Sequence, residues 1–162
     1  MVFTGTYEHT IDSKNRLAIP SEIRSQIQRT EGAREGDAIL LVVTLGEGRT
    51  LCLYTEQGFE QRARELDNSQ LETEQLLTYE RLLFSLAGRV EVDRQGRVRL
   101  PDNLLKRSRL GSEVVLLGVK DHLEVRDRKD WQDYVEQMLT QEPSVLVNPR
   151  RAMRKPGELM GR

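Results

Sequence analysis

The sequence predicts an α+β protein built from two copies of one small unit. The phrase IDSKNRLAIP at residues 11–20 returns as VDRQGRVRLP at residues 92–101. Short apolar segments typical of strands also alternate with short helical segments in both halves of the chain. Such alternation favours small antiparallel hairpins with helices beside them over a parallel, doubly wound sheet.

The repeated phrase keeps its internal spacing. Its Asp, Arg and Pro recur at a constant separation of 81 residues (93 − 12, 97 − 16 and 101 − 20), in the pairs Asp12/Asp93, Arg16/Arg97 and Pro20/Pro101. We expect a short helix behind each proline, because the first helical turn does not need the N–H that proline lacks. Two apolar strand candidates then follow. The expected helix and strands are 21–27, 38–44 and 51–55 in the first copy, and 102–108, 113–119 and 122–127 in the second.

Each copy then continues into longer helices. In the first copy, one helix is expected after Thr55 and a second after an interruption at residues 68–69. In the second copy, Asp127 is a candidate N-cap for a helix whose apolar residues recur at i, i+3, i+4, i+7 and i+8. We expect this stripe to lie in the core; it comprises Trp131, Tyr134, Val135, Met138 and Leu139. The expected organisation is a first unit over 5–55, a helical linker over 56–83, a second unit over 84–127, a C-terminal helix over 128–142 and a flexible basic tail over 143–162.

Composition excludes several classes of protein. The chain has 162 residues and a formal net charge of −1, which suits one domain or two small ones. Its charge is unevenly distributed, with seven acidic and two basic residues over 56–80 and one acidic and five basic residues over 143–162. The single Cys52 excludes an intramolecular disulfide and is typical of a reducing compartment. Neither a signal peptide nor an apolar run of about 18 residues is present, so we expect a cytoplasmic protein.

The repeated phrase has the chemistry of a tight turn that leads into a strand. Asp12 and Asp93 can accept hydrogen bonds from backbone N–H groups two or three residues further on. Gly96 readily adopts a positive φ, and Asn15 is the next best residue type for that position. After each turn, the alternation of a strand turns one set of side chains inward and the other outward. The outward set and the turns present five cations, namely Lys14, Arg16, Arg94, Arg97 and Arg99.

Two interpretations of these cations remain open on spacing alone. Asp12 could pair with Arg16, and Asp93 with Arg97, each pair locking the register of its own turn. Alternatively, cations on a stiff β-turn suit an anionic partner, since Arg and Lys on β-ribbons contact the phosphodiester backbone of nucleic acids. Both interpretations can hold together, with Asp shaping the turn and Arg reaching the partner.

The two phrases, the proline after each and the opening FTGTYEHTIDSK resemble the MraZ family from residue 3 to about residue 138. MraZ proteins resemble AbrB-type DNA-binding proteins, whose swapped-hairpin units intertwine in pairs. The resemblance implies two tandem SpoVT-AbrB-like units forming an internal pseudo-dimer, and subunits that assemble into a homo-oligomeric ring. It also implies a nucleoid-associated transcriptional regulator that represses its own division and cell-wall operon by binding repeated promoter boxes on double-stranded DNA. The DNA-facing residues would be Asp12, Lys14, Arg16, Asp93, Arg94 and Arg97.

The chain departs from the family pattern at two positions. The family usually has Lys-Gly-Arg in the first phrase, whereas this chain has Asn15 between Lys14 and Arg16. Gln95 stands where a lysine would match Lys14, so the second turn could bind differently from the first.

Other functions find little support in the sequence. His9 and His122 lack a Cys or His partner at ligand spacing, so no metal site is expected, and no cofactor is expected because no nucleotide-binding fingerprint occurs. No catalytic constellation is present either, so we expect no enzyme. The main rival is a protein-interaction scaffold or antitoxin-like module that binds a partner through the tail after Pro143.

Overall fold

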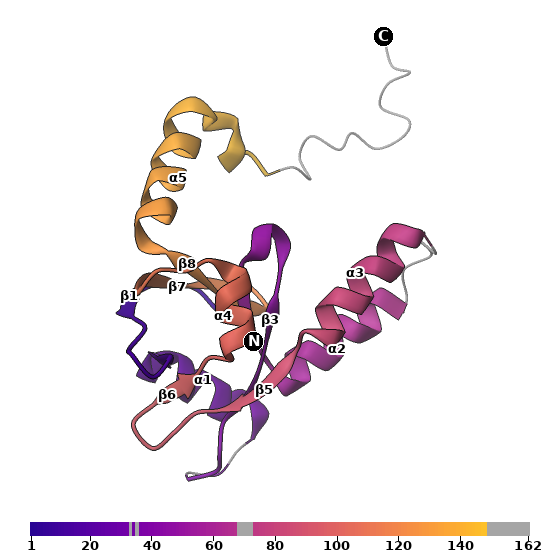
Figure 1. Ribbon diagram of the computed structural model, residues 1–162, viewed down its shortest axis with the longest axis vertical. Helices are drawn as coiled ribbons and strands as arrows, with labels where there is room; N and C mark the ends of the chain where they lie inside the picture. The colour runs from indigo at the N-terminus through magenta and orange to yellow at the C-terminus, as the bar shows by residue number, and fades with distance from the viewer. Residues whose placement is uncertain (33, 35, 68–72, 149–162) are drawn as a thin grey trace. The chain divides into compact units, whose positions relative to one another are not determined.

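A computed structural model (Figure 1) describes residues 1–32, 34, 36–67 and 73–148. The contacts between residues group the chain into two compact units: a body, Met1–Arg128, and a second unit, Lys129–Arg162. Within the described residues the elements are β1 Thr6–Thr10, β2 Arg16–Ala18, α1 Ser21–Glu31, β3 Leu40–Leu45, η1 Glu47–Arg49, β4 Leu51–Thr55, α2 Glu56–Asp67, α3 Glu74–Ser85, β5 Gly88–Glu91, β6 Arg97–Arg99, α4 Asp102–Ser108, β7 Glu113–Val119, β8 His122–Asp127, α5 Arg128–Gln141 and η2 Pro143–Leu146.

The strands of the body form an antiparallel sheet to which both halves of the chain contribute. In the described part of the chain its order is β1-β7-β8-β4-β3-β5, and β2 pairs separately with β6. The expected hairpins are present as β3–β4 and β7–β8. Strand β1 pairs with β7, and β5 pairs with β3, so the first strand of each half joins the hairpin of the other half. If β1 is exchanged with β5, β3 with β7 and β4 with β8, the strand order reads the same in reverse. The two halves of the chain therefore occupy equivalent places in the sheet. The α+β fold class is confirmed.

The repeated phrases supply the centre of the core. Leu17 and Ile19 are 0% and 2% exposed, and their counterparts Val98 and Leu100 are both fully buried, whereas Arg99 is exposed. Strand alternation therefore sorts the phrase as expected, with apolar residues inward and arginines outward. Helices α1 and α4 add buried residues directly behind each phrase, at Ile23, Ile27 and Leu104.

Two helices, α2 and α3, follow the β3–β4 hairpin. Helices α2 and α3 lie side by side (Figure 1), with the rings of Phe59 and Phe84 centred 5.3 Å apart and Arg62 donating to the Tyr79 hydroxyl at 3.3 Å. Thr73 caps α3 by accepting a hydrogen bond from the backbone N–H of Leu76. The expected interruption at residues 68–69 lies outside the described residues, as does the basic part of the expected tail.

The apolar stripe of the last helix is not part of the core. No described residue of α5 is buried, and Tyr134 and Leu139 are 49% and 46% exposed. The expectation that this stripe packs into the core of the chain was wrong. Helical periodicity identifies the face that avoids water, but it does not specify what covers that face.

Gly118 gives a direct test of how the first residues pack on β7. A methyl group there would overlap the backbone of Thr4, with the carbonyl oxygen only 2.5 Å away, in a segment held by the Phe3–Lys120 bridge. We expect Gly118→Ala to destabilise the fold by about 1–3 kcal/mol, because backbone atoms must move apart.

Chemical denaturation monitored by circular dichroism measures this change, with Gly111→Ala as the matched control. A methyl group at Gly111 would be 3.4 Å from a side-chain oxygen of Asp127, so a change within about 0.5 kcal/mol is expected. Equal stability of the two variants would contradict the described packing of residues 3–5.

Candidate nucleic-acid interface

The first turn is closed by one carboxylate. Asp12 Oδ1 accepts hydrogen bonds from the backbone N–H groups of Lys14 and Arg16, both at 2.9 Å. The backbone N–H of Asn15 donates to the carbonyl oxygen of Asp12 at 3.0 Å, and Asn15 has a φ of 60°. Asparagine tolerates this left-handed conformation, which explains how the turn forms without a glycine.

The second turn repeats the same bonds. Asp93 Oδ1 accepts from the backbone N–H groups of Gln95 at 2.8 Å and Arg97 at 3.0 Å. Gly96 donates its N–H to the Asp93 carbonyl at 2.9 Å and has a φ of 78°. The two turns are thus rigid and alike in backbone, although their tips carry different side chains.

Each turn also contains an Asp–Arg ion pair. Arg16 Nε lies 2.7 Å from Asp12 Oδ2, and Arg97 Nε lies 3.4 Å from Asp93 Oδ2. The pKa of each aspartate falls below its usual value, chiefly because the backbone N–H of the same arginine donates to the charged carboxylate. The register-lock interpretation of the spacing therefore describes a real contact in both copies.

The ion pairs leave most of each guanidinium group unused. A guanidinium has five N–H donors, and within the described residues the pair with Asp engages only Nε in both turns. The Arg16 and Arg97 side chains remain 30% and 27% exposed. Asp thus fixes the direction of each arginine, and the outer edge of the group stays available to a partner.

The two turns belong to one surface. Strands β2 and β6 pair antiparallel, with Arg16 opposite Arg99 and Ala18 opposite Arg97. Two further bonds tie each turn to the other strand: Ile19 N–H donates to the Gly96 carbonyl and Leu100 N–H to the Asn15 carbonyl, both at 2.8 Å. We call this two-stranded element with its turns the basic ribbon, residues 12–19 and 93–100.

The basic ribbon collects the candidate cations from both halves. Arg16, Arg97 and Arg99 share one face, because Leu17 and Val98 between them point into the core. Lys14 and Arg94 are exposed at the two turns. Since the strands are antiparallel, the turns lie at opposite ends, and Arg16 and Arg97 are two positions apart along the ladder, or roughly 7 Å at about 3.4 Å per residue. Arg99, which follows the second turn in sequence, therefore lies beside the first.

The surroundings of the two turns differ in charge. At the first turn, the Asn15 side chain donates to Asp102 Oδ1 of α4 at 2.5 Å. At the second, Arg24 of α1 donates from Nε to the Ile19 carbonyl at 3.1 Å, and its guanidinium covers Gly96 so closely that a methyl group there would be 2.8 Å from Cζ. The first turn thus gains a carboxylate and the second gains a cation.

Sequence reasoning did not find Arg24 or Asp102 because each helix serves the turn of the opposite half. A signal does exist in the repeat itself: at the separation of 81, Arg24 corresponds to Leu105 and Asp102 to Ser21. At both positions one copy has a charged side chain and the other copy has an uncharged one.

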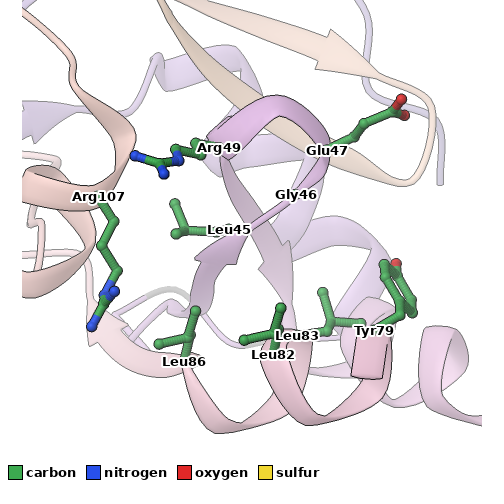
Figure 2. Close-up of a pocket in the computed structure, with 9 residues that line it drawn as sticks. All are labelled: Leu45, Gly46, Glu47, Arg49, Tyr79, Leu82, Leu83, Leu86 and Arg107. Atoms are coloured by element: carbon green, nitrogen blue, oxygen red, sulfur yellow. The ribbon is translucent and has the colours of Figure 1, made fainter. Parts of the chain in front are cut away.

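A separate apolar pocket of about 540 Å³ lies between α3 and the β3–β4 loop. Figure 2 shows Leu82, Leu83 and Leu86 along one side, with the guanidinium groups of Arg49 and Arg107 at one end. None of its lining residues belongs to the basic ribbon. Among the described helices, none has the length and apolar character needed to span a bilayer.

Comparison with known sequences identifies the family. The sequence profile described as "MraZ protein, putative antitoxin-like" matches residues 2–79 and 83–154 of this chain. The chain belongs to the MraZ family. Its curated relatives include proteins named "Transcriptional regulator MraZ" from Roseiflexus castenholzii, 35% identical over 85% of this chain and 89% of the relative, and from Moorella thermoacetica, 35% identical over 82% and 86%. A third, from Mycoplasmoides gallisepticum, is 36% identical over 83% of this chain and 88% of the relative.

The carboxylates of the two turns give this MraZ protein a defined response to acid. Their folded-state pKa values lie below the ordinary 3.8, so their contribution to stability is present above that value and disappears as pH falls through the folded pKa. We expect Asp12→Asn combined with Asp93→Asn to lower the denaturation midpoint at pH 7, and the difference from the unchanged protein to shrink steadily below pH 4.

Thermal melts between pH 7 and pH 3 follow this difference. The exposed Asp67, changed to Asn, serves as the control and should lower the midpoint little at any pH. A difference that stays constant down to pH 3 would contradict the contribution of the charged turns.

Proposed function

We propose that this chain is a sequence-specific DNA-binding transcriptional regulator that docks its basic ribbon on duplex DNA. The observation that carries the proposal is the shared face of Arg16, Arg97 and Arg99, with a rigid turn at each end. The names of the curated relatives support the same class of function.

The chemistry of the ribbon suits nucleic acid in two ways. A two-stranded β-ribbon fits the major groove of B-DNA, and arginine is the side chain best able to form paired hydrogen bonds with guanine there. The exposed Lys14 and Arg94 at the turns are placed to contact phosphates on either side, which sets the register without reading sequence. The Asp12 and Asp93 carboxylates hold the neighbouring arginines by Nε, which leaves a two-nitrogen edge for a base or phosphate.

We further propose that the chain consists of two tandem SpoVT-AbrB-like units, 5–55 and 84–127, that form an internal pseudo-dimer. Residues 56–83 would form the helical linker, residues 128–142 the C-terminal helix, and residues 143–162 a flexible basic tail. The symmetry of the strand order under exchange of the two halves supports this interpretation. In it, α1 and α4 are equivalent, which explains why each lies beside the turn of the other unit.

The wider regulatory role is also a proposal. Subunits would assemble into a homo-oligomeric ring that repeats the basic ribbon and engages repeated promoter boxes on the operon carrying its own gene. Linked binding events reinforce one another when their spacing matches, so each ribbon can bind weakly while the ring binds tightly. In this arrangement the chain would repress a division and cell-wall operon and associate with the nucleoid.

A protein-interaction role is the second candidate, because the family description includes the words "putative antitoxin-like". The exposed apolar residues of α5 would suit a protein partner. This alternative does not require the ribbon arginines to contact DNA, so the next measurement separates the two.

The ribbon arginines are tested by changing them together. We expect Arg16→Ala combined with Arg97→Ala to weaken binding to DNA from upstream of its own gene at least about tenfold, because each arginine that binds DNA is worth roughly 1–3 kcal/mol. The slope of log affinity against log salt should also fall by about 0.9 for each phosphate that the variant no longer neutralises.

Fluorescence anisotropy over a range of salt concentrations gives both quantities, and Arg81→Ala, on the exposed surface of α3, is the matched control. Affinity and salt slope that match the control would exclude the ribbon as the surface that binds DNA.

A change of Arg24 gives a finer test, because the equivalent position in the second half of the chain shows which residue to substitute. Arg24→Leu copies Leu105, the residue at the same place in the second half, and removes the extra cation beside Gly96. We expect the affinity for DNA to fall and the salt slope to decrease by about one. Arg29→Leu, at the exposed far end of the same helix, should leave both unchanged; an equal decrease in affinity for the two variants would show a general charge effect instead.

A further inference from the structure

A second cluster of reactive side chains lies on the sheet, away from the basic ribbon. Strands β4 and β8 pair so that Cys52 is directly opposite Glu124, and His122 lies two residues from Glu124 on the same strand face. The Sγ, imidazole nitrogen and carboxylate oxygen of these three residues lie within 4.8 Å of one another. Spacing along the sequence gave His122 no such partner, because Cys52 reaches it only through strand pairing.

The distances between these side-chain atoms are close to the distances between neighbouring ligand atoms in a zinc site. His122 Nε2 lies 3.2 Å from Glu124 Oε1. In a tetrahedral zinc site, with Zn–S near 2.3 Å and Zn–N or Zn–O near 2.0–2.1 Å, neighbouring ligand atoms are about 3.3–3.6 Å apart. All three ligand atoms lie within 4.8 Å of one another, so the Cys52 sulfur is at most about 1.2 Å outside this range.

The outer contacts of the cluster favour metal-binding orientations. Asp121 Oδ1 lies 2.9 Å from His122 Nδ1, so it can hold the proton on Nδ1 and direct the lone pair of Nε2 towards Cys52 and Glu124. Arg126 holds the other oxygen of Glu124 at 2.8 Å. The imidazole ring also stacks on Tyr54, with centroids 5.1 Å apart, which limits its rotation.

The cluster is sheltered from solvent. The Cys52 residue is 4% exposed, and the His122 and Glu124 side chains are 14% and 17% exposed. The three ligand atoms therefore lie together in a part of the sheet that excludes most of the solvent.

We propose that Cys52, His122 and Glu124 bind one Zn²⁺ ion, with Asp121 supporting His122 from the second coordination shell. Thiolate, imidazole and carboxylate together are ligands typical of zinc, and two anionic ligands balance its charge. Binding releases the thiol proton of Cys52 to solvent, His122 coordinates through the lone pair of Nε2, and water completes the four ligands. The site joins β4 of the first half to β8 of the second, so the metal stabilises the pairing between the halves. This inference does not depend on DNA binding.

Cobalt substitution tests the site directly. Co²⁺ adopts zinc geometries and gives a near-ultraviolet charge-transfer band when a thiolate coordinates it, and Cys52 is the only thiol in the chain. We expect the full chain, with any affinity tag removed, to develop this band at one Co²⁺ per chain and to lose it when one equivalent of Zn²⁺ is added. The midpoint of thermal unfolding should rise with the Zn²⁺ concentration, since the ligand binds the folded state.

The variants identify each ligand. Cys52→Ser should abolish the band, and His122→Gln or Glu124→Gln should weaken Co²⁺ binding more than Asp121→Asn, for which about 10- to 100-fold is expected. His9→Gln changes the other histidine of the chain and should leave binding unchanged. No band from the folded, unchanged protein would overturn the proposal, as would a band that His122→Gln and Glu124→Gln leave intact.

Discussion

The pairing of the repeated phrase with its own copy is the interaction on which this molecule depends. Strand β2 pairs only with β6 among the described strands, so neither phrase can complete its backbone hydrogen bonds without the other half. The same pairing buries Leu17 and Val98 together and leaves three arginines on the opposite face. One short ladder thus contributes both to the core and to the surface proposed to meet DNA.

This arrangement separates the role of aspartate from that of arginine. The aspartates are committed to the backbone of their turns, with two N–H donors each. Each arginine side chain contributes only its Nε to the turn, and the rest of the guanidinium group stays at the surface. A change of the aspartate therefore acts on the shape and rigidity of the turn, whereas a change of the arginine acts on what the turn can bind. The two turns are also unequal, because Asn15 is tied to Asp102 while Gly96 lies beneath Arg24.

The sequence predicted the local structure well because local structure depends on neighbouring residues. The alternation in each phrase, the helices behind Pro20 and Pro101, and the two hairpins were all expected from short-range patterns. Strand partners were not predictable in the same way, since β1 pairs with a strand more than a hundred residues away. This is why the sequence did not indicate that Arg99 lies opposite Arg16, beside the first turn. It is also why Cys52 and His122 had no apparent relation. The apolar stripe of α5 was placed in the core for another reason: helical periodicity does not specify what covers an apolar face.

The face carrying Arg16, Arg97 and Arg99 is the surface proposed to contact DNA. Chemical modification of arginines in the free and DNA-bound protein, quantified by mass spectrometry, tests it without any change to the sequence. We expect these three residues to become protected on binding, while Arg81 and Arg89, on exposed parts of α3 and β5, react equally in both states. Unchanged reactivity of the three ribbon arginines at saturating DNA would contradict it.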